Sequence, residues 1–356
     1  MKFIHTSDIH LASPLSTRLP ATKVTERVRE LTGTLARMAK EAEHIGADGI
    51  IIAGDLFDSD KITRKQLDSA LAVIATSPNV TFFYLPGNHE SDVLAASGEA
   101  LPQNLKIFSK GWTYFTVGNV TLAGRSETSP DMFDTLSLSS DRTNIAVLHG
   151  ELRDRSAEGG IIGTKDAKEK FIDYMALGHY HTYSETVLDR RGVAVYSGAP
   201  EGRGFDEPGE LGFSLIDISL GEVQHKFIPF AKRRMIIKDI DIGGLTRTYE
   251  AEARIDAALR GVSGDDIVRI NFTGKRELEL RCDVHFLTER YSERFYYFEI
   301  KDSSKLITRA EDYLYDKSLR GEFIRLCLDD DTLTDAEKES IIHCGLSALA
   351  GEAFDE

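Results

Sequence analysis

Short runs of apolar residues recur along the first two thirds of the chain, and most of them stop at a polar side chain. The run Ile50–Ala53 is too short for a helix and shows no polar alternation. This pattern is typical of a strand that is buried on both faces of a sheet. Further strands of this kind are predicted at Lys2–Thr6, Val80–Leu85, Asn144–Leu148 and Tyr174–Leu177. The pattern therefore predicts an α/β fold.

Apolar residues spaced three and four apart predict helices between these strands. From Val24 to Ile45 they mark one face of a single long helix that ends at Gly46. The same spacing predicts a helix at Arg64–Thr76. Additional strands, the first two forming a hairpin, are predicted at Trp112–Val117, Val120–Gly124, Thr182–Leu188, Val193–Ser197, Leu211–Ile218 and Val223–Ile228.

The character of the sequence changes at the basic run Ala231–Arg234. Beyond it, predicted strands no longer end in Asp or His, so we predict two domains, 1–230 and 231–356. The second domain is predicted to mix helices at Thr248–Leu259, Asp316–Cys327 and Asp335–Ala350 with strands at Ile267–Phe272 and Phe295–Ile300.

Composition limits the size of the domains, the cellular compartment and the kinds of partner. The 356 residues, 41% of them hydrophobic, suffice for one sizeable core and a small second domain. Cys282, Cys327 and Cys344 are widely spaced, which indicates a reducing compartment rather than a disulfide framework. No apolar run has signal-peptide length or the roughly 20 residues that cross a bilayer, so we expect a cytoplasmic protein without a membrane partner. The formal net charge of -15 requires any nucleic-acid site to be local, metal-supported or shared with a partner.

An Asp, Asn or His side chain follows each of five predicted strands. Open α/β sheets place their ligand sites at the carboxyl ends of strands, and Gly54 allows a sharp bend there before Asp55. Asp8 and His10 are two residues apart, and an extended backbone would point both to the same side. The candidate set is Asp8, His10, Asp55, Asn88, His149, His179 and His181.

These seven side chains predict a metal centre. Neutral imidazoles with carboxylate and amide oxygens suit manganese, iron or zinc. Seven ligands are too many for one catalytic ion but fit two ions that share a bridging carboxylate. Two ions about 3.5–4 Å apart can clamp the oxygens of an in-line displacement at phosphorus. The set therefore predicts phosphoester hydrolysis.

Five short motifs resemble those of the calcineurin-like metallophosphoesterases, in the same order and over roughly the first 230 residues. They are Asp8–His10, Gly54–Asp58, Gly87–Glu90, His149–Gly150 and Gly178–His181. The resemblance implies a four-layer α/β/β/α sandwich, here followed by a smaller C-terminal α+β domain. It also implies one ion on Asp8, His10, Asp55 and His181, and a second ion on Asp55, Asn88, His149 and His179.

The same resemblance implies two catalytic residues that are not metal ligands. His89 would face the leaving-group oxygen as a general acid or stabilise the transition state. Asp58 would orient His89, because an adjacent carboxylate favours the imidazolium form, and it can also serve as a helix N-cap. Glu90 is assigned to the scaffold.

Within the family, Met1–Leu11, Gly54–Asp58 and the tail Ser318–Leu326 are similar to SbcD-type DNA-repair exonucleases, especially their YhaO-like branch. This implies a manganese-dependent nuclease with a DNA-capping domain that acts as a dimer with an SbcC-like coiled-coil ATPase. The helical stripe from Val24 to Ile45 fits either the core or the helices through which the family dimerises. Related nucleases commonly carry histidine at the position of Asp58, which affects how His89 is polarised.

Two other functions stay open. The same centre would support hydrolysis of a smaller ester, such as a cyclic nucleotide or a phosphoprotein, and a non-catalytic scaffold would keep the fold without chemistry. Arg125, Arg203 and Lys232–Arg234 are either phosphate contacts or surface and hinge residues. Histidines outside the motifs are interpreted as ordinary core or surface residues, namely His5, His44, His225, His285 and His343.

Overall fold

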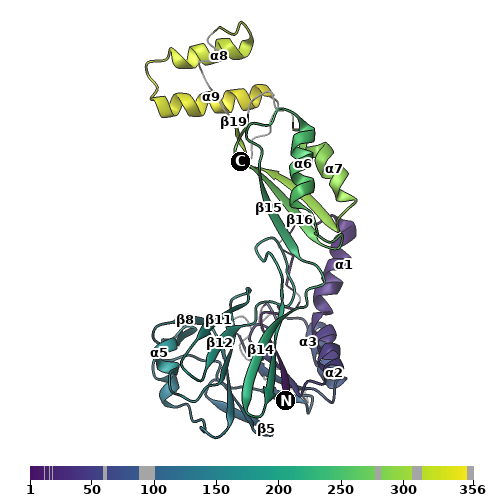
Figure 1. Ribbon diagram of the computed structural model, residues 1–356, viewed down its shortest axis with the longest axis vertical. Coiled ribbons are helices and arrows are strands. Elements are labelled where there is room, and N and C mark those ends of the chain that lie inside the picture. Colours follow the sequence, from purple (N-terminus) through teal and green to yellow (C-terminus); the bar gives the residue numbers. More distant parts are fainter. Residues whose placement is uncertain are drawn as a thin grey trace. The chain divides into compact units, whose positions relative to one another are not determined.

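A computed structural model describes residues 1–11, 13–15, 17, 19–58, 62–87, 101–276, 282–306 and 315–350. The chain divides into two compact units, Met1–Met235 and Ile236–Glu356 (Figure 1). All the described residues of the predicted metal centre lie in the first unit. Within the described ranges, no helix combines the length and the apolar character needed to cross a bilayer.

Two six-stranded sheets lie at the centre of the first unit. The first sheet has the order β14-β13-β1-β2-β3-β4, with β1 at Lys2–Thr6, β2 at Gly49–Ala53, β3 at Thr81–Leu85, β4 at Leu105–Ile107, β13 at Gly212–Ser219 and β14 at Glu222–Pro229. The second has the order β11-β12-β10-β7-β6-β5, with β5 at Thr113–Val117, β6 at Val120–Gly124, β7 at Thr143–His149, β10 at Tyr174–Gly178, β11 at Ser184–Val187 and β12 at Val193–Tyr196.

Parallel pairing brings the polar strand ends to common edges. In the first sheet β1, β2, β3 and β4 are parallel, so β1 and β2 deliver the residues that follow them to one edge. In the second sheet β6, β7, β10 and β12 are parallel, so β7 and β10 do the same. Antiparallel strands, among them the predicted hairpin β5–β6, complete both sheets.

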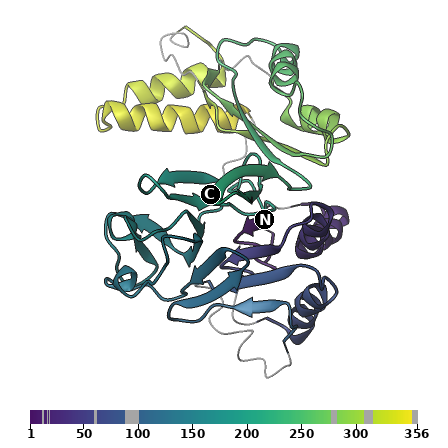
Figure 2. The ribbon, with the colours of Figure 1, turned by 60° about the horizontal axis from the view of Figure 1, so that its bottom comes forward.

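Helices cover the outer face of the first sheet. Helices α1 (Ala21–Thr32), α2 (Thr34–His44) and α3 (Arg64–Ala75) lie along one flank of this unit (Figure 2). Leu35 and Met38 of α2 pack in one core with Ile50 and Ile52 of β2. Ile51 points to the other face and packs between the two sheets. Both faces of β2 are thus covered, which is why its sequence is continuously apolar.

The outer face of the second sheet is also covered. Met132 and Phe133 of the short 3-10 helix η1 (Met132–Asp134) pack with Leu148 and Met175, and α5 (Thr164–Ala167) adds Ala167 to this core. The short strands β8 (Glu151–Arg153) and β9 (Ile161–Gly163) pair nearby. The predicted four-layer α/β/β/α sandwich is confirmed.

The prediction of one long helix over Val24–Ile45 is wrong, because Gly33 separates α1 from α2. Gly33 has φ -82° and ψ -3°, and its N–H bonds the Arg29 carbonyl as the end of α1. A glycine in a helix interior costs about 1 kcal/mol relative to alanine, so a break is least costly here. The break also separates two kinds of burial, because α2 packs Leu35 and Met38 in the core of the first sheet, whereas α1 buries Arg27 and Glu30 and leaves Val28 exposed.

A buried ion network joins α1 to the segment between β12 and the end of the first unit. The Arg27 side chain is fully buried and donates to Glu30 at 2.9 Å and to Glu201 at 2.9 Å. Arg233 donates to Glu30 at 2.7 Å. Burial alone would raise the pKa of Glu30, but hydrogen bonds from Arg233, Lys232 and Arg27 lower that pKa to about 2. Lys232 and Arg233 therefore bond to α1, and Arg233 is not a solvated surface residue.

A buried histidine between the sheets makes the first unit sensitive to acid. His5 of β1 is completely buried, with Nδ1 2.9 Å from the Tyr174 hydroxyl, and burial lowers its pKa from 6.5 to about 3. As the pH falls, the His5 ring therefore becomes protonated near pH 6.5 in the unfolded chain but only near pH 3 in the folded chain. His5 thus lowers the free energy of unfolding as the pH falls from about 6.5 to about 3.

We expect His5→Phe to remove this contribution. The free energy of unfolding should fall between pH 6.5 and about pH 4 in both proteins. The fall should be about 3 kcal/mol smaller in His5→Phe than in the wild type. Urea unfolding in the presence of a chelator measures both slopes. His44→Phe is the control, since the His44 side chain is 81% exposed. Equal pH slopes for the wild type and His5→Phe would contradict the assignment.

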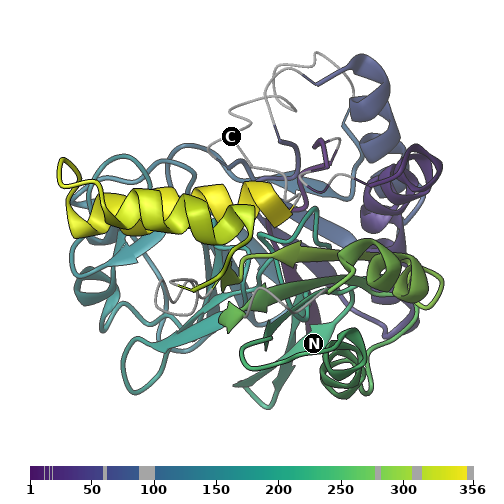
Figure 3. The same cartoon turned by 90° about the horizontal axis from the view of Figure 1, so that it is seen from above.

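The second unit has its own cores. Strands β15 (Met235–Asp241), β16 (Ile267–Thr273) and β18 (Tyr297–Asp302) form a sheet, and α6 (Thr248–Ala258) and α7 (Val284–Ser292) pack on it through Ile255, Leu287 and Tyr291. The short strands β17 (Lys275–Arg276) and β19 (Lys305–Leu306) pair separately. Helices α8 (Leu319–Leu328) and α9 (Asp335–Ala350) lie side by side around a small core of Ile324, Ile342 and Leu346 (Figure 3).

Candidate metal centre

The strand-end loops of the two sheets meet at one place in the first unit. After β1 and β2 the chain segments pair through the Asp8 N–H and Gly54 carbonyl at 3.1 Å and the His10 N–H and Asp55 carbonyl at 3.0 Å. The second sheet joins them, because Nδ1 of His149, at the end of β7, lies 2.9 Å from the carbonyl of Ala53 in β2. The polar ends of β1, β2, β7 and β10 thus face a common centre.

The backbone at this centre is left-handed rather than extended. The φ angles of Asp8, His10, Asp55 and His179 are 51°, 46°, 52° and 110°. The expectation that an extended backbone aligns Asp8 with His10 is therefore wrong, although both side chains reach the same cluster. Left-handed non-glycine residues cost of order 1–3 kcal/mol each and tend to occur at functional sites. Among the described non-glycine residues, four of the seven with positive φ are these candidate ligands.

Two glycines allow the close approach of the loops. A side chain at Gly54, whose φ is 94°, would place Cβ 2.0 Å from Nδ1 of His149. A side chain at Gly87 would place Cβ 1.9 Å from Oδ1 of Asp55. Glycine at these motif positions therefore leaves the space that the candidate ligands fill.

The first candidate cluster consists of Asp8, His10 and His181, whose nearest ligand atoms all lie within 4.8 Å of one another. Nε2 of His10 is 3.3 Å from Nε2 of His181. Oδ1 of Asp8 is 3.7 Å from Nε2 of His181 and 3.9 Å from Nε2 of His10. Asp8 and His10 are almost completely buried, whereas the His181 side chain is 29% exposed.

The second candidate cluster consists of Asp8, Asp55 and His149. Oδ2 of Asp55 lies 3.4 Å from Nε2 of His149 and 4.0 Å from Nε2 of His10, so Asp55 stands between the two clusters. His179 borders the second cluster, with its ring centroid 5.5 Å from that of His149 and its N–H donating to Asp8 at 3.0 Å. Burial lowers the pKa of the His179 ring.

Three imidazoles present the same ring nitrogen to these clusters. Nδ1 of His149 faces the Ala53 carbonyl at 2.9 Å, Nδ1 of His181 faces Glu207 at 2.6 Å, and Nδ1 of His10 faces Asp58 at 3.1 Å. Carbonyl and carboxylate oxygens only accept, so in His149 and His181 Nδ1 carries the proton and Nε2 keeps its lone pair, whereas the approach of His10 to Asp58 lacks hydrogen-bond geometry. Nε2 of His10 and Nε2 of His181 meet at 3.3 Å beside the Asp8 carboxylate, an arrangement of ligand atoms that a cation would stabilise. The donor set fits divalent metal ions.

The structure brings the described candidate ligands together. Six of the seven candidate ligands are described, and they converge: Asp8, His10, Asp55, His149, His179 and His181. Asn88, His89 and Glu90 lie outside the described residues. Asp58 lies next to His10 and also accepts from Arg203 at 3.3 Å.

Sequence reasoning missed Glu207 and misplaced Arg203. Glu207 pairs with His181, and Arg203 pairs with Glu207 at 2.8 Å instead of lying on a solvated surface. The Glu207 hydrogen bond raises the pKa of His181. Burial alone would raise the pKa of Glu207, but the hydrogen bonds to His181 and Arg203 lower it to about 2. Glu207 belongs to no motif, so no sequence signal singled it out, and nothing in the sequence pairs Arg203 with it.

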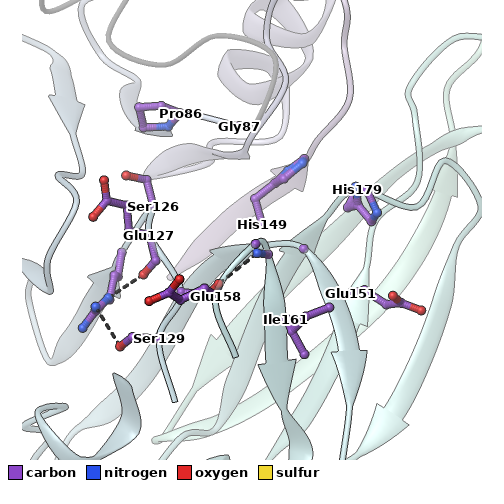
Figure 4. A pocket seen from close by; sticks show the side chains of 15 residues that line it. Pro86, Gly87, Ser126, Glu127, Ser129, His149, Glu151, Glu158, Ile161 and His179 are labelled. Atoms are coloured by element: carbon purple, nitrogen blue, oxygen red, sulfur yellow. Dashed lines mark hydrogen bonds between the residues drawn. The ribbon is translucent and has the colours of Figure 1, made fainter. Parts of the chain in front are cut away.

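A pocket of about 640 Å³ opens beside the second cluster (Figure 4). His149 and His179 border it, and its wall includes three carboxylates, those of Glu127, Glu151 and Glu158. Arg125 also lines the pocket, but part of its guanidinium is engaged by Ser129 at 3.1 Å. The volume is typical of small-molecule sites, and the wall carries more negative than positive side chains.

The two sheets, their helical layers and the paired clusters define a metallophosphoesterase. Residues 1–208 match the calcineurin-like phosphoesterase family, so the chain belongs to that family and the predicted resemblance is confirmed.

Among individual proteins, the chain is 26% identical over 254 residues to YhaO of Bacillus subtilis, described as an uncharacterised metallophosphoesterase, covering 64% of this chain and 60% of YhaO. It is 26% identical over 241 residues to the DNA double-strand break repair protein Mre11 of Sulfurisphaera tokodaii, covering 61% of this chain and 60% of Mre11. The chain thus spans 60% of the length of both relatives. A dimetal phosphatase from Danio rerio aligns with a TM-score of 0.41 and 12% identity, over 64% of this chain and 98% of that one.

Proposed function

We propose that this protein is a two-metal phosphodiester hydrolase of the SbcD type that acts on DNA ends. The observation that carries the proposal is the convergence of two buried carboxylates with three imidazoles that turn Nε2 inward. We assign Asp8, His10, Asp55 and His181 to one ion, and Asp55, Asn88, His149 and His179 to the other. The ions are Mn²⁺ in this proposal, with Fe²⁺ and Zn²⁺ as the ions that the same donors also suit.

The residues divide the work of the reaction. When bound, a pair of divalent ions supplies a hydroxide nucleophile and neutralises charge on the phosphoryl oxygens. Asp55 stands between the clusters and would keep the two ligand sets at a fixed spacing. The Ala53 carbonyl holds the Nδ1 proton of His149, which fixes the orientation of that ring. His89 would protonate the leaving-group oxygen, and Asp58 would support its imidazolium form.

The relatives support DNA as the substrate, since two proteins described as DNA double-strand break repair protein Mre11 are 26% and 24% identical to this chain over 241 residues. Because the net charge is -15, binding DNA would require attraction concentrated at the metal pair or supplied by a partner. We propose an SbcC-like coiled-coil ATPase as that partner, a homodimer as the assembly, and residues 231–356 as a capping domain. The free thiols of Cys282, Cys327 and Cys344 suit a cytoplasmic setting.

A second candidate is hydrolysis of a small ester such as a cyclic nucleotide or a phosphoprotein segment. The pocket beside His149 and His179 favours it, because about 640 Å³ accommodates a nucleotide-sized group. The carboxylates of Glu127, Glu151 and Glu158 would repel a long polyanion from that side.

Substrate comparison separates the two candidates. We expect Mn²⁺-dependent degradation of linear duplex DNA with free ends, faster when an SbcC-like partner is present, and slower degradation of blocked ends. His89→Ala should lose this turnover while keeping its metal content, and His44→Ala is the matched control on the exposed side of α2. Turnover of cyclic nucleotides or phosphopeptides with intact duplex and single-stranded DNA would establish the second candidate instead.

A further inference from the structure

Two carboxylates outside the ligand clusters each support one histidine of the first cluster. Oε1 of Glu207 is 2.6 Å from Nδ1 of His181, and Oδ1 of Asp58 is 3.1 Å from Nδ1 of His10. Both rings therefore have a carboxylate behind them and Nε2 in front, 3.3 Å from each other. His149 differs, because its Nδ1 faces the main-chain carbonyl of Ala53.

One guanidinium joins these two carboxylates. Arg203 donates from Nη2 to Glu207 at 2.8 Å and from Nη1 to Asp58 at 3.3 Å. Nη1 also donates to the Ser13 hydroxyl at 3.1 Å, and the Arg203 N–H donates to the other oxygen of Glu207 at 2.6 Å. The side chains of Glu207 and Arg203 are 2% and 16% exposed. We call Asp58, Arg203 and Glu207 the carboxylate clamp.

The loop that carries Arg203 and Glu207 is itself fixed. Arg27 donates to the Gly202 carbonyl at 2.6 Å, next to Arg203, and also binds the neighbouring Glu201. An exposed ion pair has little effect because its side chains move and water screens the charges. Here burial, several hydrogen bonds and an anchored loop hold Glu207 in place, and Arg203 ties the 35% exposed Asp58 to it, so the two carboxylates can determine the orientation of His181 and His10.

We propose that the carboxylate clamp is a set of positioning residues for one metal subsite, that of His10 and His181, and strengthens its metal affinity separately from the other subsite. The proposal rests on the proposed two-metal function. A carboxylate partner fixes the imidazole tautomer and makes the Nε2 lone pair a stronger metal ligand. Removing such a partner commonly lowers metal affinity 10–100-fold. In the other subsite, Nδ1 of His149 faces the neutral main-chain carbonyl of Ala53. Substitution of Glu207 or Asp58 should therefore lower the metal affinity of one subsite and leave that of the other unchanged.

The test is an Mn²⁺ titration of the full chain, with free Mn²⁺ followed by electron paramagnetic resonance and independently of turnover. Wild type should bind two ions. In Glu207→Gln, one ion should bind as in the wild type and the other about 10–100-fold more weakly. Asp58→Asn should weaken binding of the same ion. Because the Asp58 side chain is 35% exposed, this substitution should leave the fold intact. Turnover of Glu207→Gln should recover at saturating Mn²⁺.

Glu185→Gln is the matched control. Glu185 also pairs with a histidine, His225, at 2.9 Å, but neither residue belongs to either cluster. The control should bind both ions as the wild type does. Unchanged affinity for both ions in Glu207→Gln and Asp58→Asn, or equal weakening of both ions, would overturn the proposal. Fewer than two ions in the wild type would instead contradict the proposed function.

Discussion

Asp55→Asn is expected to lower phosphodiester turnover on the order of a thousand-fold or more, and to reduce the bound metal from two ions to at most one. Oδ2 of Asp55 lies within 4.0 Å of Nε2 of both His149 and His10, so this carboxylate of the second cluster also reaches a histidine of the first. Asparagine keeps the shape of the side chain but removes the charge that two cations would share. Steady-state kinetics with Mn²⁺ and elemental analysis of the purified protein measure the two effects.

The loss should not come from unfolding. Asp8 and Asp55 are both 2% exposed and share a cluster, so without metal their negative charges repel each other. In chelator, Asp55→Asn should therefore be at least as stable as the wild type. Asp68→Asn is the control, because Asp68 lies on the surface of α3 and pairs there with Arg64. Full metal content and normal turnover in Asp55→Asn would rule out the shared role of Asp55.

Arg27→Met is expected to lower the free energy of unfolding by about 3–5 kcal/mol. The buried guanidinium donates to Glu30, Glu201 and the Gly202 carbonyl. Methionine fills part of the volume but leaves these buried acceptors with fewer donors. Urea unfolding at neutral pH measures the change.

The matched control for Arg27 is Arg29→Met in the same helix, where the side chain is exposed. Surface substitutions of this kind stay within about 0.5 kcal/mol. A loss in Arg27→Met no larger than in Arg29→Met would show that the network around Arg27 contributes little to stability.

Local patterns were sufficient for the architecture and for most of the candidate site. The run Ile50–Ala53 predicted a doubly covered strand because its alternate residues pack on different layers. The candidate ligands were predicted because they directly follow strands, and parallel strands bring such residues to one edge whatever the intervening sequence. Gly33 could have been recognised as a helix break, but the apolar stripe continues past it and concealed the interruption.

The supporting residues could not be predicted, because their partners are distant in sequence. Arg27 and Glu201 are 174 residues apart, and Arg233 and Glu30 are 203 residues apart. A charged residue in an amphipathic helix ordinarily faces water, and only the tertiary fold reveals that Arg27 is buried. Glu207 likewise lies in an irregular loop, so its approach to His181 depends on how that loop is anchored.

Anomalous diffraction from crystals grown with Mn²⁺ tests the central claim most directly, because it locates bound ions without reference to activity. The account predicts two peaks about 3.5–4 Å apart on either side of Asp55, one beside His10 and His181 and the other beside His149 and His179. A single peak, or peaks remote from these side chains, would contradict it.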